Sequence, residues 1–207
     1  MAAMQPLWHR KVFAQGATII TAGQSAEMIY LIVDGCVRVF VDGRDGQDVV
    51  LGMRGPGEML GEVGLLEGEK RTANVSTAER SVLLWAGIRD VQTHLYGSTS
   101  MLINLGHILV QRLRLATVQT RVLAGLDVRG RLATQLLALA QEFGVPDHKG
   151  VVIPLHLTQS DLANMVGTTR VSVNQTFASW RRLKIIEIND ANRITIVNRV
   201  SLERELL

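Results

Sequence analysis

The segment Leu157–Ile186, LTQSDLANMVGTTRVSVNQTFASWRRLKII, constrains the fold most, because it carries start and stop signals for two short helices joined by a tight turn. Thr158 can cap the first helix, with Asp161 as the reciprocal acid of a capping box. Gly167 falls where this helix must end, and glycine readily adopts the left-handed conformation required there. The spacing therefore predicts a helix pair.

The second helix of the pair, expected from Thr169 to Lys184 with Thr168 or Thr169 as its cap, carries basic residues and no acid. A helix-turn-helix places the N-terminal residues of its second helix against base edges in a DNA groove. Side chains suited to such contacts occur there, namely Arg170, Ser172, Asn174 and Gln175. A surface helix pair with a solvated basic face is the alternative that this segment alone leaves open.

Length, charge and cysteine content bound the class of protein. The 207 residues suit two modest domains, and the net charge of +3 is too small for a polycation, although residues 98–126 are locally basic. The apolar stretches are shorter than a membrane span, and the N-terminus lacks the order of a signal peptide. The single cysteine, Cys36, excludes an internal disulfide and a four-cysteine iron–sulfur cluster. We expect a cytoplasmic protein without membrane partners.

Glycine turns and short strands dominate from Lys11 to about Ile88. The strand-like runs are Ala17–Thr21, Met28–Val33, Cys36–Val41, Asp48–Met53, Ala73–Ser76 and Ser81–Ala86. Many short strands with regular turn signals predict a barrel or a jelly roll.

The period becomes helical from Ser98 to about Leu126, and two apolar stripes run along this long helix. One is a coiled-coil-like seam of Leu102, Leu109, Ala116 and Leu123, with Leu105 and Leu126 on the adjoining row. The other consists of Met101, Ile108, Leu115 and Val122. We expect the seam to pair with a second subunit and the other stripe to pack on the β domain. A helix buried inside a monomer is the alternative.

The remainder of the chain predicts a winged helix-turn-helix. Asp127 can cap a further helix, which the loop Gly144–Gly150 follows. After the helix pair comes a hairpin candidate formed by Ile186–Ile188 and Ile194–Val197. The predicted fold is thus α+β, with an N-terminal β-roll, a long dimerisation helix and a C-terminal winged helix-turn-helix.

This order of motifs resembles the cyclic-AMP receptor protein/FNR family of bacterial transcription regulators over nearly the whole chain. Tyr30–Val37, YLIVDGCV, is similar to the opening of that family's β-roll. Gly61-Glu62-Val63-Gly64 followed by Arg71-Thr72-Ala73 resembles its phosphate-binding cassette, and the residues from Leu126 to Arg131 resemble its hinge. The resemblance implies three parts, which are a cyclic-nucleotide-binding-like domain at 1–97, a dimerisation helix at 98–126 and a DNA-binding domain at 127–207.

The cassette has chemistry that suits a cyclic phosphate. Arg71 can meet the negative charge with a bidentate fork, Thr72 adds a hydroxyl donor, and backbone N–H groups near Gly61 can add more. Glu62 can accept a hydrogen bond from a ribose hydroxyl. A surface ion pair between Glu62 and Arg71 is the alternative. The expected effector site also includes Val63 and Ala73.

The resemblance adds two further positions on the long helix. In cyclic-AMP-binding members, an arginine at the position of Arg112 braces the cassette glutamate, and two adjacent hydroxyl residues contact adenine. Here the pair is Ala116 and Thr117, so one hydroxyl is missing. Cyclic AMP is the expected effector, with weaker base discrimination or another effector as alternatives.

The recognition helix departs from the SRETV sequence that many members carry. It reads Thr169-Arg170-Val171-Ser172-Val173, so that Arg170 is kept for a guanine while valine replaces glutamate. Thr158, Gln159 and Ser160 resemble the group that contacts the DNA backbone and positions the domain without reading sequence. We therefore expect a different operator.

The chain is predicted to be a regulator and not an enzyme, acting as a homodimer on a near-palindromic DNA site. A family member that binds DNA without an effector, or with a different one, is the first alternative. A cupin-like metal enzyme is a remote one, because the histidines lack metal-ligand spacing. RNA polymerase is a further expected partner, since His9, Lys11 and Val145–Lys149 fall where some members touch it.

Overall fold

The structure, a computed structural model, describes residues 7–43, 48–68, 70–155, 157–189 and 193–206. In the long helix α3 (Thr99–Gly125) it describes the backbone but not the side chains of Gln111 and residues 114–124. The chain divides into two compact units, the first made of Met1–Val41 with Leu51–Leu115 and the second of Asp42–Val50 with Ala116–Leu207.

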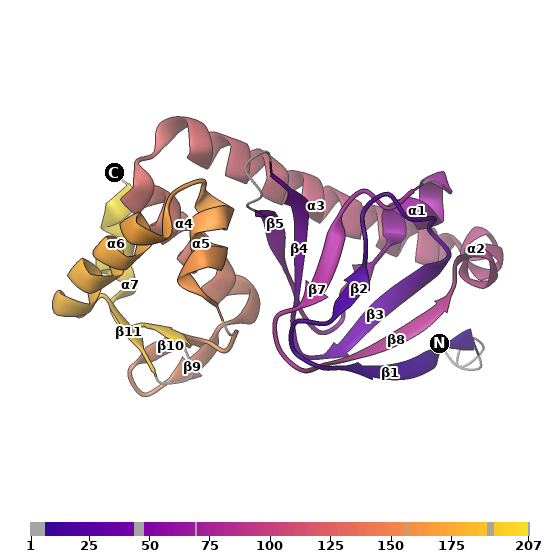
Figure 1. Cartoon of the computed structure of the whole chain (residues 1–207), viewed down its shortest axis with the longest axis horizontal. Helices are drawn as coiled ribbons and strands as arrows, with labels where there is room; N and C mark the ends of the chain where they lie inside the picture. Colours follow the sequence, from indigo (N-terminus) through magenta and orange to yellow (C-terminus); the bar gives the residue numbers. More distant parts are fainter. Residues whose placement is uncertain (1–6, 44–47, 69, 156, 190–192, 207) are drawn as a thin grey trace. The chain divides into compact units, whose positions relative to one another are not determined.

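Short strands form two four-stranded sheets at the N-terminal end of the chain (Figure 1). The first has the order β1 (His9–Phe13), β8 (Ser81–Gly87), β3 (Met28–Asp34), β6 (Met59–Leu60). The second has the order β2 (Thr18–Ile20), β7 (Asn74–Thr77), β4 (Val37–Asp42), β5 (Asp48–Arg54). Neighbouring strands run antiparallel wherever their register is defined, which confirms the predicted β-roll.

The two sheets pack face to face over a common apolar core. Its buried residues come from both sheets and are Ile20, Ile32, Val37, Leu60, Val75 and Leu83. All but Leu60, which lies on the two-residue strand β6, are on strands that also carry polar or exposed residues, as expected for sheets with one buried face. Burial of such aliphatic side chains stabilises the unit by about 1.5–3 kcal/mol each.

A second cluster joins the first sheet to helices α1 (Glu62–Glu67), α2 (Ile88–Tyr96) and α3. Its buried residues are Ile29, Leu65, Ala86, Ile88, Val91, Leu95 and Leu105, and Met101 and Leu109 pack against them. Helix α2 was not predicted from the sequence. Its apolar positions Ile88, Val91 and Leu95 have helical spacing, but the only turn signal before them is Gly87, the last residue of the preceding strand.

The described part of α3 corrects the predicted division of its two stripes. Leu105 and Leu109, which we assigned to the seam for a partner subunit, pack together with Met101 on the chain's own β-roll. Leu102 of the predicted seam is exposed, and the other exposed large apolar side chains in the described part of α3 are Ile103, Val110 and Leu113. The predicted positions Ala116 and Leu123 of the seam, and Leu115 and Val122 of the other stripe, lie outside the described side chains.

The second unit holds a winged helix-turn-helix (Figure 1). Its elements are α4 (Val128–Phe143), β9 (Val145–Asp147), β10 (Gly150–Ile153), α5 (Gln159–Val166), α6 (Arg170–Arg182), β11 (Ile186–Ile188), β12 (Ile194–Ile196), α7 (Arg199–Glu203) and a 3-10 turn at Arg204–Leu206. The strands form one sheet in the order β11-β12-β10-β9. The predicted loop Gly144–Gly150 is therefore wrong, because β9 and β10 pair as an antiparallel hairpin and extend the wing.

The helix ends in this unit follow the predicted signals. Asp127 caps α4 by accepting a hydrogen bond from the Gly130 N–H, and Thr158 and Asp161 form the capping box of α5. Gly167 ends α5 in the left-handed conformation, with φ 63° and ψ 53°. Of the two threonines considered, Thr169 caps α6.

Among the helices that the structure describes, none combines the length and the hydropathy of a membrane span.

Candidate functional site

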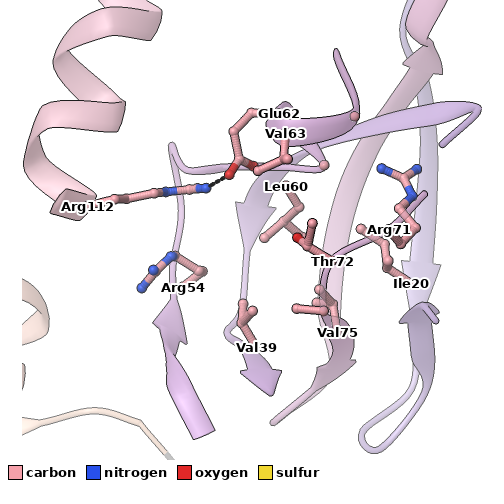
Figure 2. A pocket seen from close by; sticks show the side chains of 13 residues that line it. Ile20, Val39, Arg54, Leu60, Glu62, Val63, Arg71, Thr72, Val75 and Arg112 are labelled. Atoms are coloured by element: carbon pink, nitrogen blue, oxygen red, sulfur yellow. Dashed lines mark hydrogen bonds and ion pairs between the residues drawn. The ribbon is translucent and has the colours of Figure 1, made fainter. Parts of the chain in front are cut away.

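A pocket in the first unit brings the predicted effector residues together (Figure 2). Its lining residues come from both sheets, α1 and α3, and are Ile20, Val39, Arg54, Leu60, Gly61, Glu62, Val63, Gly64, Arg71, Thr72, Ala73, Val75 and Arg112. All predicted effector residues except Thr117 are among them. Thr117 and its neighbour Ala116 lie outside the described side chains.

The pocket combines apolar and charged lining residues. Ile20, Val39, Leu60 and Val75 supply aliphatic surface, while three arginines and one carboxylate supply charge. The cavity measures about 80 Å³, well below the roughly 300 Å³ at which small-molecule sites begin. A nucleotide-sized ligand therefore requires lining side chains to move.

The turn into α1 depends on two glycines. Gly61 precedes the helix with φ 87°, and a Cβ added to it would lie 2.4 Å from Nη1 of Arg71. A Cβ on Gly64 would lie 2.3 Å from the Cβ of Ala26. Side chains at these positions would displace either Arg71 or the helix, so the glycine pair allows the backbone to approach the arginine closely.

Glu62 is buried and pairs with Arg112. Its side chain forms an ion pair with Nη1 of Arg112, and Nη2 of Arg112 donates to the Met59 carbonyl oxygen at 2.6 Å. Burial lowers the pKa of Arg112, and the negative charge of Glu62 opposes this shift. The alternative of a surface pair between Glu62 and Arg71 is thus wrong, because Glu62 is only 6% exposed and its partner is Arg112.

Arg71 is held in place but keeps a free donor. Its Nη2 donates to the Met28 carbonyl oxygen, whereas its buried Nη1 has no hydrogen-bond partner among the described residues. Burial lowers the pKa of Arg71, and Tyr30 and Glu62 partly offset this effect. A cation with a buried, unmet donor favours an anionic acceptor. The arrangement therefore fits the phosphate of a cyclic nucleotide.

Arg54 is a pocket residue that the sequence did not single out. It ends β5, and its side chain is only 14% exposed. It lies next to Gly55 in a stretch without a recognisable motif. The one usable signal was a single basic residue after residues 49–53, which carry no charge, and that signal is too common to select a site.

Helix α6 of the second unit has sharply different inner and outer faces. Val173, Thr176, Phe177 and Trp180 are buried. Four of the predicted base-contacting residues, Arg170, Val171, Asn174 and Gln175, are exposed. Two others, Thr169 and Ser172, are occupied locally, because their hydroxyl groups lie 3.0 Å apart and Thr169 also accepts from the Ser172 N–H.

The predicted backbone-contacting group lies at the start of α5. The Thr158 hydroxyl donates to Asp161 at 2.6 Å and accepts from the Asp161 N–H, so the cap already uses its polar capacity. Gln159 is half-buried and donates to Asn174 at 3.4 Å, which links the two helices of the motif. Ser160 is exposed. These side chains can therefore help to position the domain, but they offer no reactive group.

The remote metal-enzyme alternative finds no site. Over the described ranges, no group of three or more His, Cys, Asp or Glu residues is placed to hold a metal ion.

Comparisons with known proteins match both units. Residues 10–92 match the family described as cyclic nucleotide-binding domain, and residues 130–205 match the Crp-like helix-turn-helix domain. A CRP-like cAMP-activated global transcriptional regulator of Mycobacterium tuberculosis is 29% identical, over 88% of this chain and 84% of that protein. A global nitrogen regulator of Synechococcus elongatus is also 29% identical, over 93% and 87%.

Solved structures agree in fold. FixK2 from Bradyrhizobium japonicum superposes with a TM-score of 0.84 at 18% identity, covering 95% of this chain and 96% of that one. A transcriptional regulator of the CRP family from Thermus thermophilus gives 0.79 at 25% identity, covering 95% and 96%. With a cyclic nucleotide-binding domain followed by a Crp-like helix-turn-helix, the chain belongs to the CRP/FNR family and is a DNA-binding transcription regulator.

Proposed function

We propose that this regulator binds cyclic AMP in the β-roll pocket and, as a homodimer, binds a near-palindromic DNA site. The observation that carries the proposal is Nη1 of Arg71, a buried donor without a partner among the described residues, beside Gly61. An anionic ligand satisfies this donor. The cAMP-activated relative in Mycobacterium tuberculosis supports the choice of effector.

The ligand's phosphate is placed against Arg71 and Thr72, with the backbone around Gly61, Val63 and Ala73 completing the cradle. Glu62 accepts from the ribose, and Arg112 holds the carboxylate in position. The resemblance to cyclic-AMP-binding members assigns Thr117 to the adenine of the ligand bound by the partner subunit. An effector that lacks a negative charge would leave Arg71 unsatisfied, so we expect no response to a nucleoside.

For DNA, Arg170 is assigned to a guanine, with Val171, Asn174 and Gln175 reading neighbouring bases. Thr158, Gln159 and Ser160 position the domain on the backbone, and Thr169 with Ser172 fixes the start of α6. Val171 is 64% exposed, as required for a side chain that meets a thymine methyl group.

The homodimer is assigned to the exposed row Ile103, Val110 and Leu113 on α3. These residues are 53%, 48% and 68% exposed, and their spacing of seven and three residues is that of a coiled-coil seam. A second copy would cover this row, and the dimer would present two recognition helices to paired half-sites.

The effector acts by population shift. It can change DNA affinity only as far as it binds the DNA-competent arrangement more tightly than the incompetent one. RNA polymerase is a further proposed partner, through His9, Lys11 and Val145–Lys149, and the proposed site of action is the cytoplasm.

Calorimetric titration with cyclic AMP, with cyclic GMP as the control, tests the proposal. We expect saturable binding of cyclic AMP with one ligand per subunit. The absence of heat with both nucleotides at two temperatures would favour the second candidate, a regulator that works without an effector or with a different one. The small cavity and the alanine at position 116 favour that candidate, and DNA selection without effector would then identify the operator.

A further inference from the structure

The pocket contains a third arginine that the proposed cyclic AMP site does not use. Arg71 is reserved for the phosphate, and Arg112 is fully engaged with Glu62 and the Met59 carbonyl oxygen. Arg54 lines the same cavity from the end of β5. A ligand with one phosphate leaves this guanidinium without a role.

The hydrogen bonds of Arg54 leave part of its fork free. Nη1 donates to the Met53 carbonyl oxygen at 2.7 Å, and Nε lies 3.3 Å from Glu58. Glu58 is itself engaged in a turn, because its other oxygen accepts from the Gly55 N–H at 2.7 Å. Nη2 of Arg54 makes no hydrogen bond within the described ranges of the chain.

The position of Arg54 separates it from the phosphate end of the pocket. In Figure 2 the guanidinium of Arg71 lies at one side, that of Arg54 lies at the other side with Arg112, and Thr72 and Val75 lie between. Arg54 and Arg112 are close enough to interact. After burial, which lowers the pKa of Arg112 most, the positive charge of Arg54 lowers it further.

Glu62 and Glu58 offset part of the repulsion between the two guanidinium groups, and a ligand that brings electron-rich atoms to that side offsets more of it. Planar paired acceptors match the arginine fork best. The O6/N7 edge of guanine offers such a pair, and so do the oxygens of a second phosphate.

We propose that Arg54 is a specificity-determining residue of the effector site, selecting ligands that present paired acceptors at the end remote from the phosphate held by Arg71. The inference rests on the proposed cyclic-nucleotide site and deepens it. The selected ligand is a cyclic nucleotide that carries a guanine or a second phosphate, and where this selection holds, that nucleotide replaces cyclic AMP as the effector of the proposed site.

Four ligands separate the two sources of paired acceptors. Cyclic AMP has neither group, cyclic GMP has the guanine, cyclic di-AMP has the second phosphate, and cyclic di-GMP has both. Titration of the full-length protein with each ligand gives four affinities. We expect at least one of the last three to bind about tenfold more tightly than cyclic AMP, the discrimination that a good bidentate pair provides.

Arg54→Leu should remove this preference, so that the affinities for the other three ligands fall toward that for cyclic AMP. Arg54→Lys keeps the charge without the fork, so it should retain a preference for a second phosphate but lose one for guanine. Arg10→Leu makes the same change at an exposed strand position outside the pocket lining, and it should leave all four affinities unchanged. Circular dichroism and thermal unfolding verify that each variant folds.

The outcomes distinguish this inference from the proposed function. Suppose that the unmodified protein and Arg54→Leu both bind cyclic AMP and show the same affinities for the other three ligands relative to cyclic AMP. In that case Arg54 has no selective role, and the cyclic AMP proposal stands. If the unmodified protein binds none of the four, the cyclic-nucleotide proposal fails and this inference fails with it. The inference is supported if the affinities relative to cyclic AMP fall in Arg54→Leu but not in Arg10→Leu.

Discussion

The two units use arginine in opposite ways. In the first unit, Arg71 and Arg112 are half-buried and bound to backbone carbonyl oxygens, and Arg112 also pairs with Glu62. On α6, Arg170 and Arg181 are exposed. Arginines fixed before binding select a ligand by geometry, whereas solvent-exposed arginines contribute charge first and geometry only upon contact.

The largest effect that we expect is a difference in how strongly DNA affinity and effector affinity depend on salt concentration. DNA affinity should fall about 10³-fold or more between roughly 50 and 200 mM salt, because exposed cations release counterions from about six or more phosphates. Effector affinity should change far less, since partly buried charges are screened much less. Fluorescence anisotropy with operator DNA and calorimetry with effector measure the two slopes. An equal salt dependence of the two affinities would show that the buried and the exposed arginines do not differ in this way.

Arg71→Ala should abolish the effector response and weaken effector binding by about 100-fold, because the phosphate loses a charge-assisted, bidentate partner. Effector-independent DNA binding should remain, which anisotropy without ligand can check. Arg80→Ala, at an exposed bend before β8 and outside the pocket, is the matched control. Unchanged effector affinity in Arg71→Ala would show that this arginine is only structural.

Arg170→Ala should cost about 1–3 kcal/mol of DNA binding and relax discrimination at one base position. Binding to a panel of single-base operator variants measures both effects. Arg181→Ala, an exposed arginine at the other end of α6, provides the control. A uniform loss over the whole panel would mean that Arg170 contacts phosphate only.

Glu205→Gln tests the smallest effect, within the second unit. Arg129 binds Glu205 through two hydrogen bonds of 2.6 and 2.7 Å and lies over the Trp180 ring. The hydrogen bonds from Arg129 lower the pKa of Glu205. Because Arg129 is 37% exposed, the pair should contribute no more than about 1 kcal/mol to the free energy of unfolding.

The pH dependence of this contribution has a defined sign. A carboxyl whose pKa is lower in the folded state stabilises the fold above its ordinary pKa, 4.5 for this group. The contribution is lost as the pH falls through the lowered value. The free energies of unfolding of the unmodified protein and of Glu205→Gln, measured with urea, should therefore differ near neutral pH and converge in acid. A difference that persists unchanged in strong acid would point to packing instead.

Local signals predicted the second unit better than the first. The caps at Asp127, Thr158 and Gly167 follow from residues within one turn of each helix end, and all three are confirmed. In α3 both stripes are apolar, so only the tertiary contacts reveal that Leu105 faces the β-roll. Sequence periodicity cannot choose between two equally apolar faces.

The effector pocket was predictable where a motif marked it and not elsewhere. Gly61, Glu62, Arg71 and Thr72 lie in the cassette that the sequence displays, and the structure brings them to one cavity with Arg112. Arg54 reaches the same cavity from a strand with no such marker. The orientation of Arg71 toward Met28 was equally hidden, because its partner is a backbone carbonyl 43 positions away.

Gly61 has a consequence for genetics. Its φ of 87° and the 2.4 Å that would separate an added Cβ from Arg71 mean that any other residue there would both strain the turn and displace that arginine. In a selection for regulators that ignore their signal, codons 61 and 71 should therefore be recovered as a single phenotypic class. A glycine with no side chain would then behave, to the geneticist, as if it were part of the receptor's anion-binding group.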